Sequence, residues 1–150
     1  MSQIHLVVSV SCVEDGRILM VHEEDNGIKC WNQPAGHVEP NEALVDAAMR
    51  EALEETGYQV ELTGLQGIYE GIHSKAGTHF VRVAFYGNAL AKKTDQLDPD
   101  IIEAQWLPIN DLLAGNYPLR SGMTRKALED LATAPIAPLS LIKNLFSEMF

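Results

Sequence analysis

Residues 41–57 concentrate acidic side chains on a predicted helix, with the sequence N-E-A-L-V-D-A-A-M-R-E-A-L-E-E-T-G. Since each residue turns an α-helix by about 100°, Glu54 and Glu55 fall roughly 60° and 40° to either side of Glu51. Three carboxylates in one sector repel each other by a few tenths of a kcal/mol per pair. That arrangement becomes useful when a hard cation that prefers oxygen ligands lies among them. The segment therefore predicts a helix that holds a divalent metal ion.

The same segment contains boundary signals for the helix. Asn41 is a good N-cap, Glu42 adds negative charge to the first turn, and Gly57 can take a positive φ and end the helix. We therefore expect a helix from about 42 to 56. An apolar stripe on the opposite half of the helix should pack on a sheet. Its predicted members are Val45, Met49, Ala52 and Leu53.

The residues that precede this helix favour an ordered loop. Residues 31–40 read W-N-Q-P-A-G-H-V-E-P, with two prolines and one glycine in ten positions. Such a segment punctuates secondary structure. We expect its backbone carbonyls to face the same metal ion.

Residues 36–58 resemble the Nudix box, the pattern G-x5-E-x7-R-E-x-x-E-E-x-G followed by a bulky residue. The chain fills every defining charged and glycine position: Gly36, Glu42, Arg50, Glu51, Glu54, Glu55 and Gly57. Ala52 is the one departure, since the family more often has a larger aliphatic residue there, and it concerns packing only. The resemblance implies an α/β/α sandwich around a mixed sheet and a hydrolase of phosphoanhydrides.

Segments outside the box resemble a bacterial subfamily of nucleoside di- and triphosphate phosphatases. Members of that subfamily also act on thiamine and hydroxymethylpyrimidine pyrophosphates. The matching segments are residues 31–37, Phe80-x-Arg82, Asp100-Ile101 ahead of Trp106, and Leu119-Arg120-Ser121.

The resemblance implies roles for the box residues. Glu51, Glu54 and Glu55 would bind Mg²⁺, for which Mn²⁺ can substitute, and the backbone carbonyl of Ala35 or Gly36 would add a ligand. Arg50 would pair with an acidic neighbour, Glu42, and hold the glutamates in place. The general base is either Glu51 or an acid from a loop outside the box. Asp98, Asp100 and Glu103 are available there, and Asp100 is favoured because it lies six residues before Trp106.

Basic residues provide candidates for contacts with substrate phosphates. Arg82 and Arg120 lead because they lie in the subfamily-like segments, and Lys75 and Arg17 are further candidates. Trp31 either stacks on a base or pyrimidine ring or covers the core, and packing is the favoured alternative. No role is assigned to the histidines at positions 22, 37, 73 and 79.

Length and charge limit the classes of protein to consider. A chain of 150 residues with 46% hydrophobic and 21% charged residues fits one soluble domain, residues 1–150. The formal charge of −10 argues against duplex nucleic-acid binding, which needs clusters of Lys and Arg. It permits small phosphorylated substrates, because a bound Mg²⁺ bridges carboxylate to phosphate.

Cellular location is inferred from weak signals. Cys12 and Cys30 form neither a metal-ligand spacing nor a disulfide framework, which favours a reducing compartment, and Cys12 should lie in the core. The N-terminus has no basic region, and no apolar run approaches about 18 residues. We therefore expect a cytoplasmic protein that does not bind membranes, either a monomer or a homodimer.

The remaining pattern predicts an α/β fold. Strands are expected over residues 4–13, 17–22, 60–71, 78–90 and 101–107, with a turn at 14–16 and a loop at 71–77. Helices are expected at 108–113, at 122–132 and in the tail over 139–150. The helix at 122–132 should turn Met123, Ala127, Leu128 and Leu131 inward.

The combined prediction is a Mg²⁺-dependent Nudix hydrolase that cleaves the phosphoanhydride of a nucleoside di- or triphosphate or of a small organic pyrophosphate. Residues 72–74 read Ile-His-Ser where ADP-ribose hydrolases tend to have a proline, and the arrays of NADH and coenzyme A hydrolases are also missing. One alternative is a Nudix-fold module that binds a nucleotide without turnover. Another is an interaction protein whose acidic helix is only a solvated face.

Overall fold

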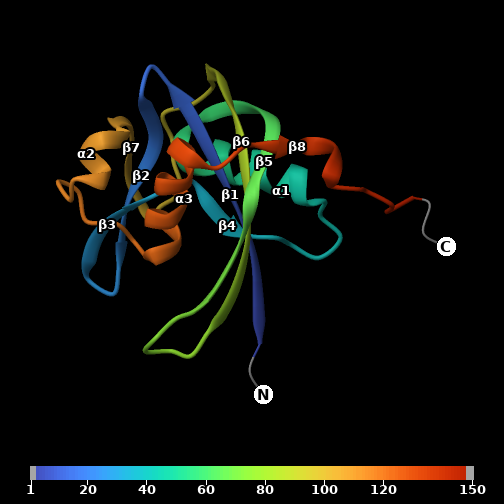
Figure 1. Ribbon diagram of the computed structural model, residues 1–150, viewed down its shortest axis with the longest axis horizontal. Helices are drawn as coiled ribbons and strands as arrows, with labels where there is room; N and C mark the ends of the chain where they lie inside the picture. The colour runs from blue at the N-terminus through green and yellow to red at the C-terminus, as the bar shows by residue number, and fades with distance from the viewer. Residues whose placement is uncertain (1–2, 148–150) are drawn as a thin grey trace.

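The computed structural model describes residues 3–147, which form a mixed sheet with helices on both faces (Figure 1). This confirms the predicted α/β class. The strands are β1 (Ile4–Glu14), β2 (Arg17–Asp25), β3 (Ile28–Asn32), β4 (Ala35–His37), β5 (Tyr58–Ile72), β6 (His79–Lys92), β7 (Ile101–Pro108) and β8 (Ala137–Pro138). The helices are α1 (Leu44–Thr56), α2 (Ile109–Leu113) and α3 (Gly122–Thr133), followed by a short 3-10 helix, η1 (Leu139–Leu141).

Strand β1 joins the two parts of the sheet. Over most of its length it lies parallel to β6, and β4 pairs with it in antiparallel register on the other side. Its last residues pair with β2, where Val13 lies opposite Ile18. Strands β3 and β7 then flank β2, and β5 and β8 extend the sheet beyond β6. As a result, β4 places Gly36 beside the central strand β1.

Side-chain alternation along the strands builds a core on each face. Val8, Val10 and Cys12 of β1 share one core cluster with alanines of α1, so Cys12 lies in the core as predicted. On the other face, Ile18 and Met20 of β2 pack with residues of α2 and α3. The two cores separate α1 from the other helices and make the sandwich that the family resemblance implies (Figure 1).

Helix α1 differs from its prediction at its start and on its apolar face. It begins at Leu44 after Ala43, without a side-chain cap. The predicted N-cap, Asn41, instead has a left-handed φ of 65°. The predicted end at Gly57 is confirmed, since Gly57 has a φ of 79° and donates its N–H to the carbonyl of Leu53.

The predicted apolar stripe of α1 is wrong in part. Leu53 is 38% exposed, whereas Val45 and Met49 are half-buried and pack against the core as predicted. Ala52 is buried as predicted, together with Ala47 and Ala48. Small alanines let the helix lie close to the sheet, so the buried face rotates toward the side that carries Glu51 and Glu55.

The predicted loop over residues 31–40 contains strand residues. Its first two residues end β3, and β4 occupies positions 35–37. Strand β3 was not predicted, although Asn26 and Gly27 both have a positive φ and form the two-residue turn that an Asn-Gly pair favours. The second strand, predicted to end at residue 22, therefore continues to Asp25.

The remaining elements largely confirm their predictions. Strands β5, β6 and β7 are each a little longer than predicted, and α2 and α3 occur where expected. In α3, Ala127 and Leu128 are buried, whereas Met123 and Leu131 are half-buried. The predicted tail helix is wrong over residues 142–147, which form no helix after η1, and residues 148–150 lie outside the described part. Within residues 3–147, no helix has the length and apolar character needed to cross a membrane.

Candidate functional site

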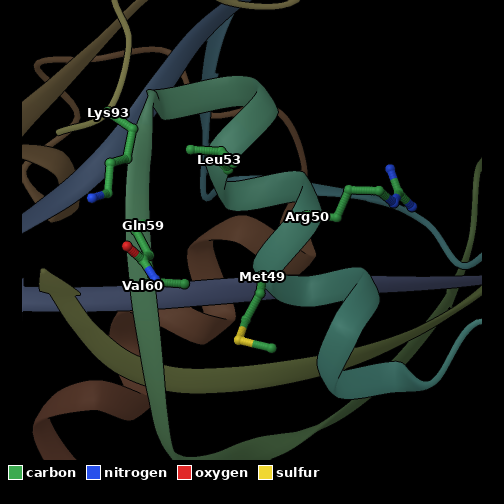
Figure 2. A pocket seen from close by; sticks show the side chains of 6 residues that line it. All are labelled: Met49, Arg50, Leu53, Gln59, Val60 and Lys93. Atoms are coloured by element: carbon green, nitrogen blue, oxygen red, sulfur yellow. The ribbon is translucent and has the colours of Figure 1, made fainter. Parts of the chain in front are cut away.

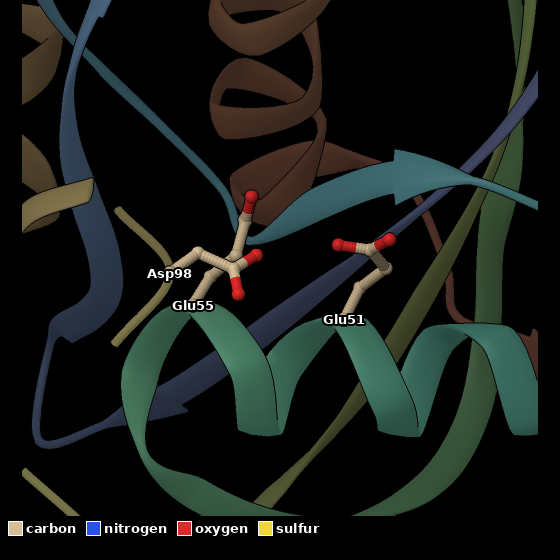
Figure 3. A group of neighbouring side chains, drawn as sticks. All are labelled: Glu51, Glu55 and Asp98. Carbon is tan, nitrogen blue, oxygen red and sulfur yellow. The ribbon is translucent and has the colours of Figure 1, made fainter. Parts of the chain in front are cut away.

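Three carboxylates converge beside β4. One carboxylate oxygen from each of Glu51, Glu55 and Asp98 lies within 4.8 Å of the other two (Figure 3). The two glutamates extend from successive turns of α1, and Asp98 reaches them from the loop between β6 and β7. Oxygen donors at this spacing suit a hard divalent cation such as Mg²⁺ or Mn²⁺.

Strand β4 positions both glutamates. The backbone N–H of Ala35 donates a 2.9 Å hydrogen bond to Oε1 of Glu55. A Cβ atom on Gly36 would overlap the Glu51 carboxylate, so a glycine is needed at this point of close approach. The structure thus brings Ala35 and Gly36 to the cluster through an N–H group and a missing side chain, while the predicted role of a carbonyl as a metal ligand stays a prediction.

Main-chain contacts hold Asp98 in place. Its N–H donates to the carbonyl oxygen of Glu54 over 3.0 Å, and its own carbonyl accepts from the N–H of Ile101 over 2.9 Å. The first contact ties the loop to the last turn of α1. A residue far along the chain therefore completes the carboxylate group.

Burial makes it unfavourable for all three carboxyl groups of the cluster to be charged without a cation. Desolvation raises the pKa of Glu55 to about 8, and repulsion from Glu23, Glu51 and Asp98 adds to this while the Ala35 N–H opposes it. Desolvation also raises the pKa of Glu51, although its contact with Arg50 opposes the shift. A divalent ion would supply the missing positive charge.

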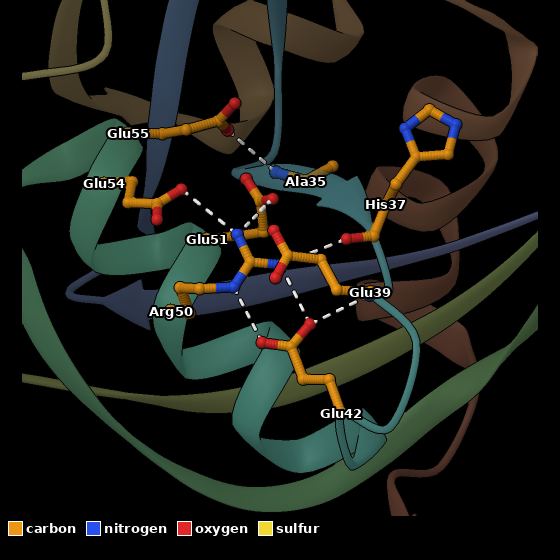
Figure 4. Close-up of polar contacts among 8 residues, drawn as sticks. All are labelled: Ala35, His37, Glu39, Glu42, Arg50, Glu51, Glu54 and Glu55. Carbon is orange, nitrogen blue, oxygen red and sulfur yellow. Dashed lines mark hydrogen bonds and ion pairs between the residues drawn. The ribbon is translucent and has the colours of Figure 1, made fainter.

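Arg50 clamps the glutamates from the outer side (Figure 4). Its Nε and Nη2 donate to the two carboxylate oxygens of Glu42 over 2.7 and 2.9 Å, as predicted for that pair. Nη1 donates to Glu51 over 2.9 Å and to Glu54 over 3.2 Å, and Nη2 also reaches the carbonyl of His37 over 3.1 Å. The guanidinium lowers the pKa of Glu42 to about 2. Arg50 thus fixes α1 to the segment that follows β4.

The third box glutamate lies outside the cluster of three. The side chain of Glu54 is 41% exposed and contacts Arg50, whereas Asp98 takes the third position beside Glu51 and Glu55. Sequence reasoning named Asp98 as an available acid but favoured Asp100, which is exposed and is not part of this cluster. Glu103, the other available acid, is half-buried in β7 and accepts a 2.6 Å hydrogen bond from Gln105.

Arg82 is buried on the sheet face opposite α1. It is 6% exposed and donates to Oε1 of Gln33 over 3.3 Å and to Oδ1 of Asn32 over 3.5 Å. Burial lowers its pKa to about 10, helped by Arg120 and opposed by Glu23 and Glu55. A buried guanidinium whose two hydrogen bonds go to neutral amides is suited to bind an anion.

Arg120 is already paired with acids. Its Nη1 donates to Glu23 over 2.7 Å, and its Nη2 lies 3.7 Å from Asp25. Glu23 is only 8% exposed and raises the pKa of Glu55 through repulsion. Sequence reasoning missed Glu23, and the signal that could have found it is the acidic run that follows His22, which the longer β2 carries toward the site.

The other predicted substrate contacts lie elsewhere. Trp31 is 6% exposed, stacks on His22 with ring centroids 4.4 Å apart, and packs in the core, which agrees with the favoured alternative. Lys75 lies near the exposed tip of the β5–β6 hairpin, which projects from the body of the fold (Figure 1). Arg17 lines a hollow of about 250 Å³ with Trp106 at the β1–β2 turn.

A second hollow, of about 380 Å³, lies on another side of α1 (Figure 2). Its lining contains no carboxylate, and the Arg50 side chain turns away from the other lining residues. It is therefore distinct from the carboxylate cluster. The lining residues are Met49, Arg50, Leu53, Gln59, Val60 and Lys93.

Comparisons with known proteins agree with the fold and identify the family. The family model for the NUDIX domain matches residues 4–128. The chain is 33% identical over 143 residues to "Phosphatase NudJ" of Escherichia coli strain K12, covering 90% of this chain and 89% of that protein. The same identity and coverage are found for "Phosphatase NudJ" of Shigella flexneri.

Solved structures give the same result. A NUDIX hydrolase from Nitrosomonas europaea superposes with a TM-score of 0.91 at 31% identity, covering 97% of this chain and 99% of that chain. A MutT NUDIX hydrolase from Burkholderia pseudomallei superposes with a TM-score of 0.74 at 29% identity, covering 85% and 98%.

Proposed function

This chain belongs to the Nudix family of hydrolases, and on that premise we propose that it is a Mg²⁺-dependent enzyme that cleaves a phosphoanhydride bond. The substrate is a nucleoside di- or triphosphate or a small organic pyrophosphate, with thiamine and hydroxymethylpyrimidine pyrophosphates as candidates. The observation that carries the proposal is the convergence of the Glu51, Glu55 and Asp98 carboxylates beside the Arg50 clamp. The whole chain, residues 1–150, acts as one domain in the cytoplasm.

Water attacks phosphorus, and the bond from that phosphorus to the bridging oxygen breaks. A diphosphate gives a monophosphate and orthophosphate, and a triphosphate gives either a monophosphate and pyrophosphate or a diphosphate and orthophosphate. When bound, Mg²⁺ would neutralise phosphate oxygens and lower the pKa of a coordinated water. Glu51, Glu54 and Glu55 are its proposed ligands, with a carbonyl of Ala35 or Gly36, and Asp98 joins them on the basis of its position.

The proton of the attacking water needs an acceptor within hydrogen-bond reach. Glu51 and Asp98 both lie in the cluster, and both are therefore candidates for the general base. Asp100 remains a candidate as well, because exposed loop acids can approach a bound substrate. Arg50 is a positioning residue, since it contacts the glutamates and would not touch the substrate phosphates.

Arg82 and Arg120 are the proposed contacts for the anionic part of the substrate. Arg82 is favoured because its hydrogen bonds go to neutral amides, whereas Arg120 is already paired with Glu23. Lys75 is a further proposed contact from the β5–β6 hairpin, whereas Trp31 packs in the core. The similarity to proteins named phosphatases supports release of orthophosphate over other outcomes.

The test is phosphate release from a panel of nucleoside di- and triphosphates, thiamine pyrophosphate and hydroxymethylpyrimidine pyrophosphate. Each reaction is run with Mg²⁺, with Mn²⁺ and with EDTA. We expect metal-dependent release from at least one compound and none with EDTA. Tight nucleotide binding without release would contradict the proposal and favour a binding module instead.

A further inference from the structure

Arg82 is a buried cation with too few acceptors. Its two hydrogen bonds are long, and its Nε has no partner within the described residues. None of the ion pairs found within residues 3–147 includes Arg82. A guanidinium has five N–H donors, and a buried charge without a counter-ion is costly. Arg82 is therefore suited to bind an anion that this chain does not supply.

The first turn of α3 has spare donors of its own. The helix is 12 residues long, and its N-cap, Ser121, accepts from the N–H of Thr124. The N–H groups of Gly122 and Met123 have no acceptor inside the helix, as at every helix start. The first turn has no acidic residue, and apart from its chain neighbours and its own helix backbone no heavy atom lies within 4 Å of the position of a Cβ on Gly122. The positive end of the helix dipole thus has open space on the side of Gly122.

Two buried amides connect Arg82 to this first turn. Oδ1 of Asn32 accepts from Arg82 and also from Oγ1 of Thr124 over 2.8 Å. Oε1 of Gln33 accepts from Arg82, and its Nε2 donates to the carbonyl of Thr124 over 3.1 Å. Gln33 and Thr124 are fully buried, so the arrangement is rigid. One oxygen, Oδ1 of Asn32, thus lies 3.5 Å from the guanidinium and 2.8 Å from Thr124, so the guanidinium lies beside the first turn of α3.

The carboxylate cluster lies close to this place. Gln33 is two residues before Ala35, whose N–H binds Glu55, and two residues span at most about 7 Å. The negative charge of Glu55 raises the pKa of Arg82, which also indicates that the two side chains are close. A short chain of phosphates can bridge such a distance.

We propose that Arg82 and the amino end of α3 form a subsite for a third phosphate group, one that lies outside the anhydride that is cleaved. This inference rests on the proposed function, because it places a second part of the same substrate. The subsite favours substrates with a phosphate beyond the anhydride held at the carboxylates. Nucleoside triphosphates belong to that class, whereas thiamine pyrophosphate has no such additional group.

The test is Gly122→Asp, which adds a negative charge at the first residue of α3. An acid at that position favours the helix, so the melting temperature should stay equal or rise. The same charge repels an incoming phosphate. We expect KM for a nucleoside triphosphate to rise roughly three- to tenfold with kcat retained. KM for thiamine pyrophosphate should change less.

Ala132→Asp is the matched control, because it adds the same charge to an exposed position in the last turn of α3. It should leave KM unchanged. Arg82→Gln should weaken binding in the same direction as Gly122→Asp, and if Arg82→Gln does not fold, Gly122→Asp decides. Unchanged KM in Gly122→Asp would overturn the subsite.

A binding measurement separates this inference from the proposed function. Titration calorimetry with a methylene-bridged nucleoside triphosphate analogue in EDTA measures binding at the subsite without hydrolysis. Weaker binding in Gly122→Asp than in Ala132→Asp supports the subsite even if no substrate in the panel is hydrolysed. Equal binding in the two variants contradicts the subsite even if the wild type is an active hydrolase.

Discussion

The carboxylate of Glu51 lies directly over the Cα of Gly36, with no room between them for a methyl group. Gly36→Ala should therefore displace Glu51 from the cluster while leaving the rest of β4 paired with β1. We expect a loss of kcat/KM of about tenfold or more, because misplaced ligands lower transition-state stabilisation. Steady-state kinetics with saturating Mg²⁺ measures it.

A double-mutant comparison identifies the cause of that loss. If steric overlap with Glu51 is responsible, Gly36→Ala should add little to the defect of Glu51→Ala. Additive losses would show that Gly36 acts through something other than the position of Glu51.

Glu55→Gln should lower turnover by about 10²-fold or more, because it removes a charged group from the cluster. The fold should remain intact, since Gln can still accept the N–H of Ala35. Circular dichroism and kinetics together check both statements. Glu61→Gln, an exposed change in β5, serves as the control for loss of one carboxylate. Activity near that of the wild type in Glu55→Gln would contradict the assigned site.

The stability of the metal-free protein should fall as the pH rises. The folded pKa of Glu55, about 8, exceeds its ordinary value of 4.5, so the folded protein holds one proton more than the unfolded protein between those values. Stability is then highest below about pH 4.5 for this group and decreases by up to about 1.4 kcal/mol per pH unit until pH 8. Denaturant unfolding in EDTA from pH 5 to 9 measures the slope.

Two comparisons test that origin of the slope. Glu55→Gln should flatten it, and an unchanged slope in that variant would assign the titration to another group. Mg²⁺ should bind more tightly as the pH rises toward 8, because the ion displaces a proton from the cluster. Affinity that is constant over this range would contradict the raised pKa of Glu55.

Asp98→Asn and Asp100→Asn form a matched pair of changes two residues apart. Asp98 lies in the cluster and Asp100 is exposed outside it, so Asp98→Asn should cause the larger loss of kcat. A shift in the pH profile of kcat would identify the general base, whereas a change confined to Mg²⁺ affinity would identify a ligand. A larger loss of kcat in Asp100→Asn would indicate that Asp100 is the general base, as favoured from the sequence.

Arg50→Met should release Glu42 and loosen Glu51 and Glu54 at the same time. Loss of a residue that orients ligands typically costs about 10- to 100-fold in metal affinity or activity. Calorimetric titration with Mn²⁺ and kinetics at high Mg²⁺ measure the two effects. Arg125→Met, which removes an exposed i,i+4 pair with Glu129, should leave both unchanged.

Local signals were sufficient for the helix and its end. The spacing of Glu51 and Glu55 and the glycine at position 57 depend only on helical geometry, so they could be predicted from the sequence. The start of α1 could not, because Glu42 turns outward to Arg50 and to the N–H of Glu39. Asn41 takes a left-handed conformation in that turn instead of capping the helix.

Residues joined across the fold were harder to predict. Asp98 reaches the cluster through a main-chain contact with α1, and no pattern near position 98 indicates that contact. Gln33 and Thr124 look like ordinary polar residues in the sequence, yet both are fully buried and bonded to each other. Contacts between segments that are far apart in the sequence determine these positions.

The loop that delivers Asp98 lies against the carboxyl end of α1, where the N–H groups of Lys93 and Asp98 bind the carbonyls of Gly57 and Glu54. During synthesis, a ribosome that has released only the first 97 residues has produced the helix but not the third carboxylate. The growing chain therefore cannot assemble the three-carboxylate cluster until this later segment emerges and wraps back.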